Sequence, residues 1–288
     1  MLNTKYKCAI LAWGLLFHVS PIQAWDAYGN PATITAGPRI SISAGSVNSE
    51  KVETSFSAVQ ATISGQQKAM RISDYFGAEK LGGDSVLLGA SYPISNRTEI
   101  FGKFGTTNIE PNNQPSIQDS TTYSLGIKIS PPTSSGIRTG IILQMENSAV
   151  DYTYQRPWLY LGEIGGTDSF LVKRENIIGQ EEIRLNRVSA VIGMSRSRGV
   201  VRPYFSMVVN KLAGDINISG SGVGGLGCLP SGSGCQTVTF NTSGEITERT
   251  SVGGVLGLSF FSEEGTDMSV EWHLGSHAGL FLSAGIAL

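Results

Sequence analysis

His273 and His277 are the residues of this sequence best suited to acid–base chemistry, and neither has the neighbours that catalysis needs. A hydrolytic mechanism places a histidine beside a serine nucleophile or a carboxylate. Ser276 directly precedes His277, and adjacent side chains in a tight turn diverge. His273 follows Glu271 at a spacing of two, so both share one face of a strand. We expect His273 to be an interior structural residue and predict that the protein is not an enzyme.

Eight charged residues alternate with apolar residues, so that they share a face with glycine and serine. They are Glu99, Lys103, Lys128, Arg138, Glu146, Arg187, Arg202 and Glu271. Charges removed from water need partners of opposite sign, and one interpretation is therefore a salt-bridged interior that stiffens the fold. The other is a narrow path that conducts ions or small solutes past these charges.

Cys228 and Cys235 lie close together in a stretch rich in glycine and serine. In an exported protein, two nearby cysteines predict a disulfide, and no further cysteine or histidine stands nearby in the sequence to complete a metal site. Residues 220–225 match the pattern G-x-G-x-x-G, but no helix is expected after them, which argues against a dinucleotide site. We expect neither a cofactor nor a metal.

The elements that carry these residues are predicted to be strands. The 288 residues include 36 glycines, 15% charged residues and 40% hydrophobic residues, and apolar residues alternate with small or polar ones in ten segments. These segments are residues 39–46, 85–94, 98–105, 123–130, 137–146, 187–194, 201–210, 251–260, 268–274 and 280–288. Glycine and serine dominate the second face, as suits a crowded lumen rather than a surface in water. The pattern predicts an all-β, transmembrane, antiparallel up-and-down barrel of about ten strands, with its apolar face toward lipid.

The connections between these segments alternate between short turns and long polar loops, as in barrels with short turns on one side of the membrane. The long loops are predicted at residues 47–83, 106–121, 147–181 and 211–249. Residues 59–64 alternate weakly and could add a hairpin, which would make twelve strands. Loop 147–181 contains four aromatic residues that suit either a girdle at the membrane surface or a contact site, namely Tyr152, Tyr154, Trp158 and Tyr160.

The N-terminus has the three parts of a secretory signal peptide. Residues 1–7 are basic, residues 8–19 are apolar, and residues 20–24 end in Ala24, a small residue suited to cleavage. The apolar run is shorter than the roughly 20 residues of a membrane-spanning helix. We predict a signal peptide at 1–24, a periplasmic segment at 25–38 and the barrel at 39–288. The net charge of −2 gives no reason to expect nucleic-acid binding.

Residues 90–105, ASYPISNRTEIFGKFG, resemble the strand–turn–strand hairpin of small bacterial outer-membrane β-barrel proteins. Residues 280–288 are similar to the C-terminal strand of such proteins, although the chain ends in Leu288 where an aromatic residue is usual. This resemblance implies a monomer in the outer membrane, surrounded by lipid and recognised by the barrel-insertion machinery through its C-terminal strand. Omptin-type barrel proteases resemble the chain in strand number, but their paired aspartates and Asp-His unit have no match here.

Three functions remain open at this point. The first is a non-enzymatic outer-membrane barrel that is either structural or a narrow passive channel. The second is a surface adhesin or receptor-like protein that acts through loops 147–181 and 211–249. The third is an outer-membrane hydrolase that uses His273 or His277.

Overall fold

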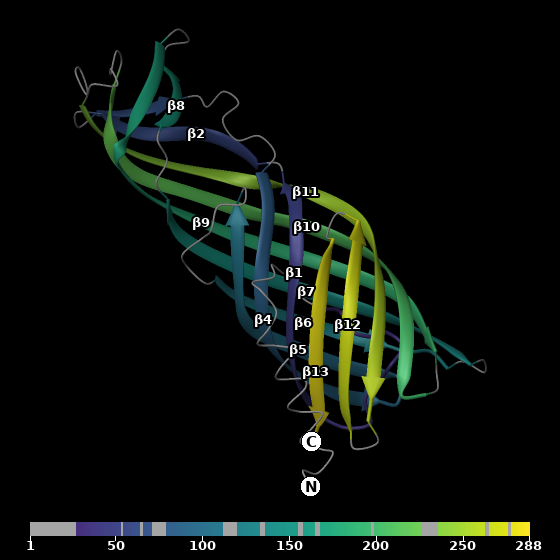
Figure 1. The fold of residues 1–288 in the computed structure, drawn as a ribbon. Coiled ribbons are helices and arrows are strands. Elements are labelled where there is room, and N and C mark those ends of the chain that lie inside the picture. The colour runs from purple at the N-terminus through teal and green to yellow at the C-terminus, as the bar shows by residue number, and fades with distance from the viewer. Residues whose placement is uncertain are drawn as a thin grey trace.

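The computed structural model describes residues 27–52, 54–63, 66–70, 79–111, 120–132, 136–154, 158–164, 168–196, 199–225, 236–262, 265–275 and 278–288. Strands dominate these residues (Figure 1). They are β1 (Arg39–Val52), β2 (Thr54–Ile63), β3 (Gln66–Met70), β4 (Glu79–Ser95), β5 (Thr98–Pro111), β6 (Ser120–Ile129), β7 (Ile137–Tyr154), β8 (Trp158–Ile164), β9 (Asp168–Arg196), β10 (Val201–Gly225), β11 (Gln236–Phe261), β12 (Thr266–Gly275) and β13 (Gly279–Ala287).

Ten of the described strands form a closed antiparallel ring, in the order β1-β4-β5-β6-β7-β9-β10-β11-β12-β13. Two antiparallel ladders, between β1 and β13 and between β10 and β11, complete the circuit. Each of the ten strands coincides with one segment expected from the sequence, except that residues 130 and 288 lie just beyond β6 and β13, and the predicted barrel is confirmed. Closure leaves the ring without a free edge, so the strands pair all of the backbone that faces the membrane.

The two faces of the ring have the polarity of a membrane barrel. The outward face exposes large apolar side chains, including Leu125 at 66% and Met145 at 67%. The inward face buries polar ones, including Ser124 at 1% and Glu271 at 0%. This arrangement is the reverse of a soluble protein and needs lipid around it. No helix within the described residues is long and apolar enough to cross a membrane.

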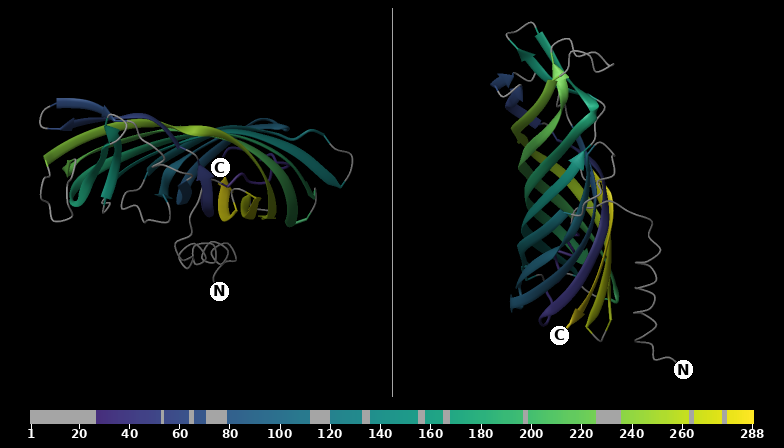
Figure 2. Two further views of the ribbon diagram at one scale, coloured as in Figure 1. Left: turned by 90° about the horizontal axis from the view of Figure 1, so that it is seen from above. Right: turned by 90° about the vertical axis from the view of Figure 1, so that its left-hand side faces the viewer.

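Above the membrane, β7, β9, β10 and β11 continue as a sheet that rises from one side of the barrel (Figures 1 and 2). The strand β9 has 29 residues, whereas β13 on the opposite side has 9. Residues 147–181 and 211–249 are therefore largely strand, and their interpretation as loops was wrong. We call the parts of these strands beyond Asn147, Asn186, Lys211 and Thr250 the sheet extension.

The outward and inward faces of the strands exchange polarity where the sheet extension begins. This exchange explains why residues 147–181 and 211–249 were expected to be loops. On β9, the outward side chains change from Ile192 and Val188 to Asn186 and Arg184. The inward side chains change in the opposite sense, and Leu185 is buried at 2%. Beyond the lipid the same strand faces water, so its apolar residues turn inward. Because the apolar residues change from the outward to the inward face along one strand, a search for a single apolar face does not recognise the whole strand.

The weak alternation at residues 59–64 corresponds to the hairpin of β2 and β3, but this hairpin lies outside the ring. The strand β2 pairs with residues 238–246 of β11, beyond the residues of β11 that pair with β12. Because β12 and β13 are short, the chain passes above them from β1 to reach the free edge of β11. The alternative of twelve barrel strands is therefore wrong.

Candidate functional site

The centre of the lumen is occupied by the chain that precedes β1. Residues 27–35, which we call the lumen segment, come from the part of the sequence expected in the periplasm. Ala27, Tyr28 and Ala32 are buried, and their neighbours are inward-facing residues of the barrel strands. Asn30 donates from Nδ2 to Ser195 Oγ on β9 at 2.9 Å. The segment therefore fills part of the lumen instead of lying below it.

Tyr28 anchors the lumen segment. Its hydroxyl donates to Asn210 Oδ1 at 2.9 Å and lies 3.3 Å from Ser189 Oγ. Its ring stacks on the imidazole of His273, with centroids 5.2 Å apart and planes inclined by 6°. Hydrogen bonds at the tip and ring contacts along the side fix both the height and the orientation of this residue.

An apolar cluster inside the barrel receives Tyr28. Beside Tyr204, its members are Ile142, Val191, Val208 and Val255 on β7, β9, β10 and β11, all of which are buried. Ile142 pairs with Val191, and Val191 pairs with Val208, so the cluster crosses neighbouring strands at one level. Sequence reasoning missed it. The sequence signal that could have revealed this cluster is one apolar residue on the otherwise polar face of each of four neighbouring barrel strands.

Glu271 on β12 binds the start of the lumen segment. Its carboxylate accepts hydrogen bonds from the backbone N–H groups of Tyr28, at 3.0 Å, and Gly29. It also accepts from the hydroxyl of Tyr204 at 2.9 Å and lies 2.9 Å from Nε2 of His273. These donors compensate a buried carboxylate for its lost water.

His273 lies inside the barrel, as expected, and its contacts are structural. The ring is 4% exposed and lies between Tyr28 and Phe281, whose ring centroid is 4.1 Å away. Its Nε2 faces Glu271. A ring enclosed in this way has no room for a substrate, which argues against a hydrolase that uses His273. His277 lies outside the described residues.

Two glycines of the barrel wall make room for the backbone of the lumen segment. A Cβ at Gly140 would lie 1.9 Å from the carbonyl oxygen of Pro31, and a Cβ at Gly193 would lie 2.6 Å from the Pro31 ring. Next along the segment, the carbonyl of Ala32 accepts a hydrogen bond from Ser130 Oγ at 3.2 Å. The segment thus touches the wall too closely for any larger residue at these glycines.

Near the end of the barrel opposite the sheet extension, two ion pairs join strands of the barrel wall. Lys128 Nζ lies 3.5 Å from Glu99, which also accepts hydrogen bonds from the backbone N–H and the hydroxyl of Thr35. Arg39 reaches across β13 to Asp267 at 2.6 Å. Gly285 of β13 permits this, because a Cβ there would collide with the guanidinium of Arg39.

The structure places the eight predicted lumen charges at different depths. Glu99, Lys128, Glu146, Arg187 and Glu271 are buried, and Arg187 lies 4.0 Å from Glu146. Lys103 is half-buried and donates to the carbonyl of Ala27. Arg202 is half-buried and lies over the ring of Phe261, 4.2 Å from its centroid. Arg138 is exposed. The sequence did not single out Arg39 and Asp267, which stand at or near the first positions of their strands.

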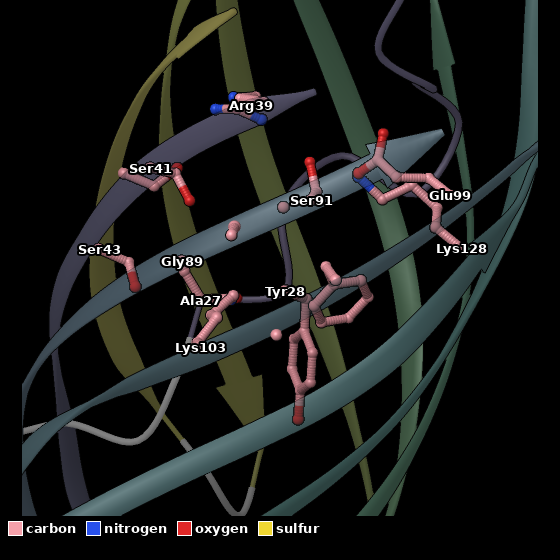
Figure 3. A pocket seen from close by; sticks show the side chains of 15 residues that line it. Ala27, Tyr28, Arg39, Ser41, Ser43, Gly89, Ser91, Glu99, Lys103 and Lys128 are labelled. Atoms are coloured by element: carbon pink, nitrogen blue, oxygen red, sulfur yellow. The ribbon is translucent and has the colours of Figure 1, made fainter. Parts of the chain in front are cut away.

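A cavity of about 60 Å³ remains between the lumen segment and the wall formed by β1, β4, β5, β6 and β13 (Figure 3). Ser41 and Ser91 line it together with Arg39, Lys103 and Lys128. Within the described part of the chain, two buried polar atoms near it have no hydrogen-bond partner, Arg39 Nε and Ser91 Oγ. The lumen is therefore asymmetric around Tyr28, with the apolar cluster on one side and a polar side that retains space.

The side chains of the remaining predicted site residues lie outside the described part of the structure. Cys228 and Cys235 lie outside the described residues, as does the whole of the expected signal peptide, so both features stay predictions. Tyr152, Tyr154, Trp158 and Tyr160 lie in β7 and β8. Only their backbone is described.

The closed ring, its apolar outer face and its polar interior define an integral outer-membrane β-barrel. No protein-family model matches the sequence, and no curated protein matches it. Solved structures with a similar fold include the translocator domain of the autotransporter NalP from Neisseria meningitidis, with a TM-score of 0.41, 11% identity, and coverage of 99% of this chain and 98% of that chain.

Two further structures of outer-membrane proteins are similar in the same sense. The protease OmpT from Escherichia coli has a TM-score of 0.29 at 10% identity, over 89% of this chain and 97% of that chain. The toluene transporter TbuX from Ralstonia pickettii has a TM-score of 0.31 at 11% identity, over 90% and 92%. Similarity at this level says nothing about activity.

Proposed function

We propose that this protein is a narrow outer-membrane channel for small hydrophilic solutes, constricted by its own lumen segment. The observation that carries the proposal is the asymmetric filling of the lumen. Tyr28 packs against the apolar cluster on β7, β9, β10 and β11. The other side, on β1, β4, β5, β6 and β13, keeps a cavity lined by hydroxyl and charged groups.

The chemistry of that cavity supports water inside it. Arg39 Nε and Ser91 Oγ are buried without a protein partner in the described chain, and buried polar atoms normally bind protein groups or water. A cavity of about 60 Å³ has room for several water molecules. A hydrated lane beside the lumen segment is the first requirement for passage of a polar solute.

Two apolar side chains lie where this lane would continue toward the outside. Leu87 on β4 and Phe281 on β13 point inward and are buried at 0% and 1%. They flank β1, because Leu87 pairs with Ser43 and Phe281 pairs with Gly45. Apolar constrictions of this kind gate channels by excluding water. The conformation described here is thus the constricted state of the channel.

Planar-bilayer recordings test the proposal. We expect small unitary steps from the wild-type protein and a several-fold larger unitary conductance after deletion of residues 27–35, because the deletion empties the lumen. Phe281→Ala should also raise the conductance by widening the upper end. Leu280→Ala is the matched control, since Leu280 is the next residue on the same strand but faces lipid. Absence of steps from both the wild type and the deletion variant would overturn the proposal.

A surface-recognition role is the second candidate, and the sheet extension favours it. On the extension, Asp215, Asn217 and Glu245 face outward and are exposed. A rigid sheet that projects polar side chains beyond the membrane is a suitable contact surface for another macromolecule. Silence of every variant in the bilayer recordings would favour this role over the channel.

A further inference from the structure

The charges around the lumen cavity are unequal in sign. Three cationic side chains line it, Arg39 on β1, Lys103 on β5 and Lys128 on β6, whereas Glu99 is the acidic residue among the described lining residues. These side chains reach the cavity from different strands (Figure 3). The lining therefore presents more positive than negative groups to whatever enters.

The other nearby carboxylates are held away from the cavity. Asp267 is bound to Arg39 across β13 and is not among the lining residues. Glu271 accepts the backbone N–H groups of Tyr28 and Gly29, and it too is not part of the lining. Arg39, Lys103 and Lys128 thus line the cavity, whereas Asp267 and Glu271 are bound to other groups and do not line it.

The hydrogen-bonding groups at the cavity favour an acceptor. Arg39 Nε is a donor only, is buried and has no acceptor among the described residues. Ser91 Oγ is also unpartnered and can donate. Both atoms belong to lining residues but are themselves buried, so they add donor character to the cavity wall without contacting a ligand directly. A metal cation in the cavity would face three positive charges.

From this geometry we infer that the cavity is a binding site for a small inorganic anion and that the channel prefers anions to cations. The inference rests on the proposed channel function, whose narrow lane passes through this cavity. The space of about 60 Å³ fits a chloride-sized ion that keeps part of its hydration shell. The three cationic side chains of the lining lower the electrostatic barrier for anions and raise it for cations.

Reversal potentials under a potassium chloride gradient test the inference with the full-length barrel. We expect a reversal potential of the sign that marks chloride as the more permeant ion. Lys103→Gln should reduce the anion-to-cation permeability ratio several-fold, because it removes one positive charge from the lining. Glu99→Gln should increase the same ratio, because it removes the acidic lining group. Two opposite shifts are not expected from a general loosening of the lumen.

Lys211→Gln provides the matched control. Lys211 is exposed on the outward face of β10, so the substitution makes the same charge change outside the lumen and should leave the ratio unchanged. Channels that prefer potassium, or a ratio that Lys103→Gln and Glu99→Gln do not move, would overturn the anion site and leave the channel intact. A protein that never conducts, even without residues 27–35, would instead overturn the proposed function itself.

Discussion

Glu271 holds the lumen segment through the geometry of a single carboxylate. Oε1 accepts the N–H of Gly29 and the hydroxyl of Tyr204, while Oε2 accepts the N–H of Tyr28 and faces His273 Nε2. Each oxygen thus serves one backbone group and one side chain. A glutamine has the same shape but presents an amide NH₂ in place of one oxygen, and that group cannot accept a hydrogen bond.

We predict that Glu271→Gln lowers the free energy of unfolding by about 1–3 kcal/mol, because buried donors lose their acceptor. Urea unfolding of the barrel in lipid vesicles measures this change. Glu182→Gln is the control, since Glu182 pairs with the exposed Arg184 outside the membrane and should change stability by less than about 1 kcal/mol. Equal stabilities of the two variants would contradict the role assigned to Glu271.

At the scale of elements, the lumen segment has no regular structure of its own and depends on the wall around it. The carbonyl of Pro31 lies directly over Gly140 of β7. A methyl group at that position cannot coexist with the present path of the segment. The strand itself tolerates alanine, so the effect of the substitution should fall on the segment rather than on the ring.

We predict that Gly140→Ala displaces residues 27–35 and increases their amide hydrogen exchange, with a loss of stability of about 1–3 kcal/mol from overpacking. Exchange measured by mass spectrometry on the N-terminal peptide reports the displacement. Gly136→Ala is the control near the start of the same strand, because a Cβ there would meet nothing within 4 Å. Unchanged exchange in Gly140→Ala would show that the segment does not rest on this glycine.

The strands could be predicted from the sequence because one physical demand, apolar toward lipid and small or polar toward the lumen, repeats at every second residue. The sheet extension could not be predicted in this way, because it lies in water. There the apolar Leu185 faces inward and the charged Arg184 faces outward. The lumen segment could not either. Tyr28 stands in a short run without alternation, and its partners, such as Asn210 and Glu271, come from strands far away in the sequence.

For the whole molecule, the exchange of polarity between the faces marks the outer edge of the lipid. Val188 on β9, Val209 on β10 and Val252 on β11 are outward and exposed, and Asn186 and Lys211 follow them beyond the edge. The change occurs on neighbouring strands at nearly the same register. It therefore follows one level around this side of the barrel, as a flat membrane surface requires.

We predict that Ile192→Arg destabilises the inserted barrel by about 2–4 kcal/mol, whereas Asn186→Arg costs about 0–1 kcal/mol. The two residues share the outward face of β9, but Ile192 lies within the lipid level and Asn186 lies beyond its edge. Reversible unfolding from lipid vesicles measures both variants. Similar losses for both substitutions would place the edge of the membrane elsewhere.

The bonds of the lumen segment also constrain the order of assembly. The segment binds Glu99 on β5 and Glu271 on β12, strands that come together only when β1 meets β13 and the ring closes. Its docking must therefore be a late event that reports a completed barrel. A purification tag fused just before residue 27 would have to enter the lumen and compete with this docking.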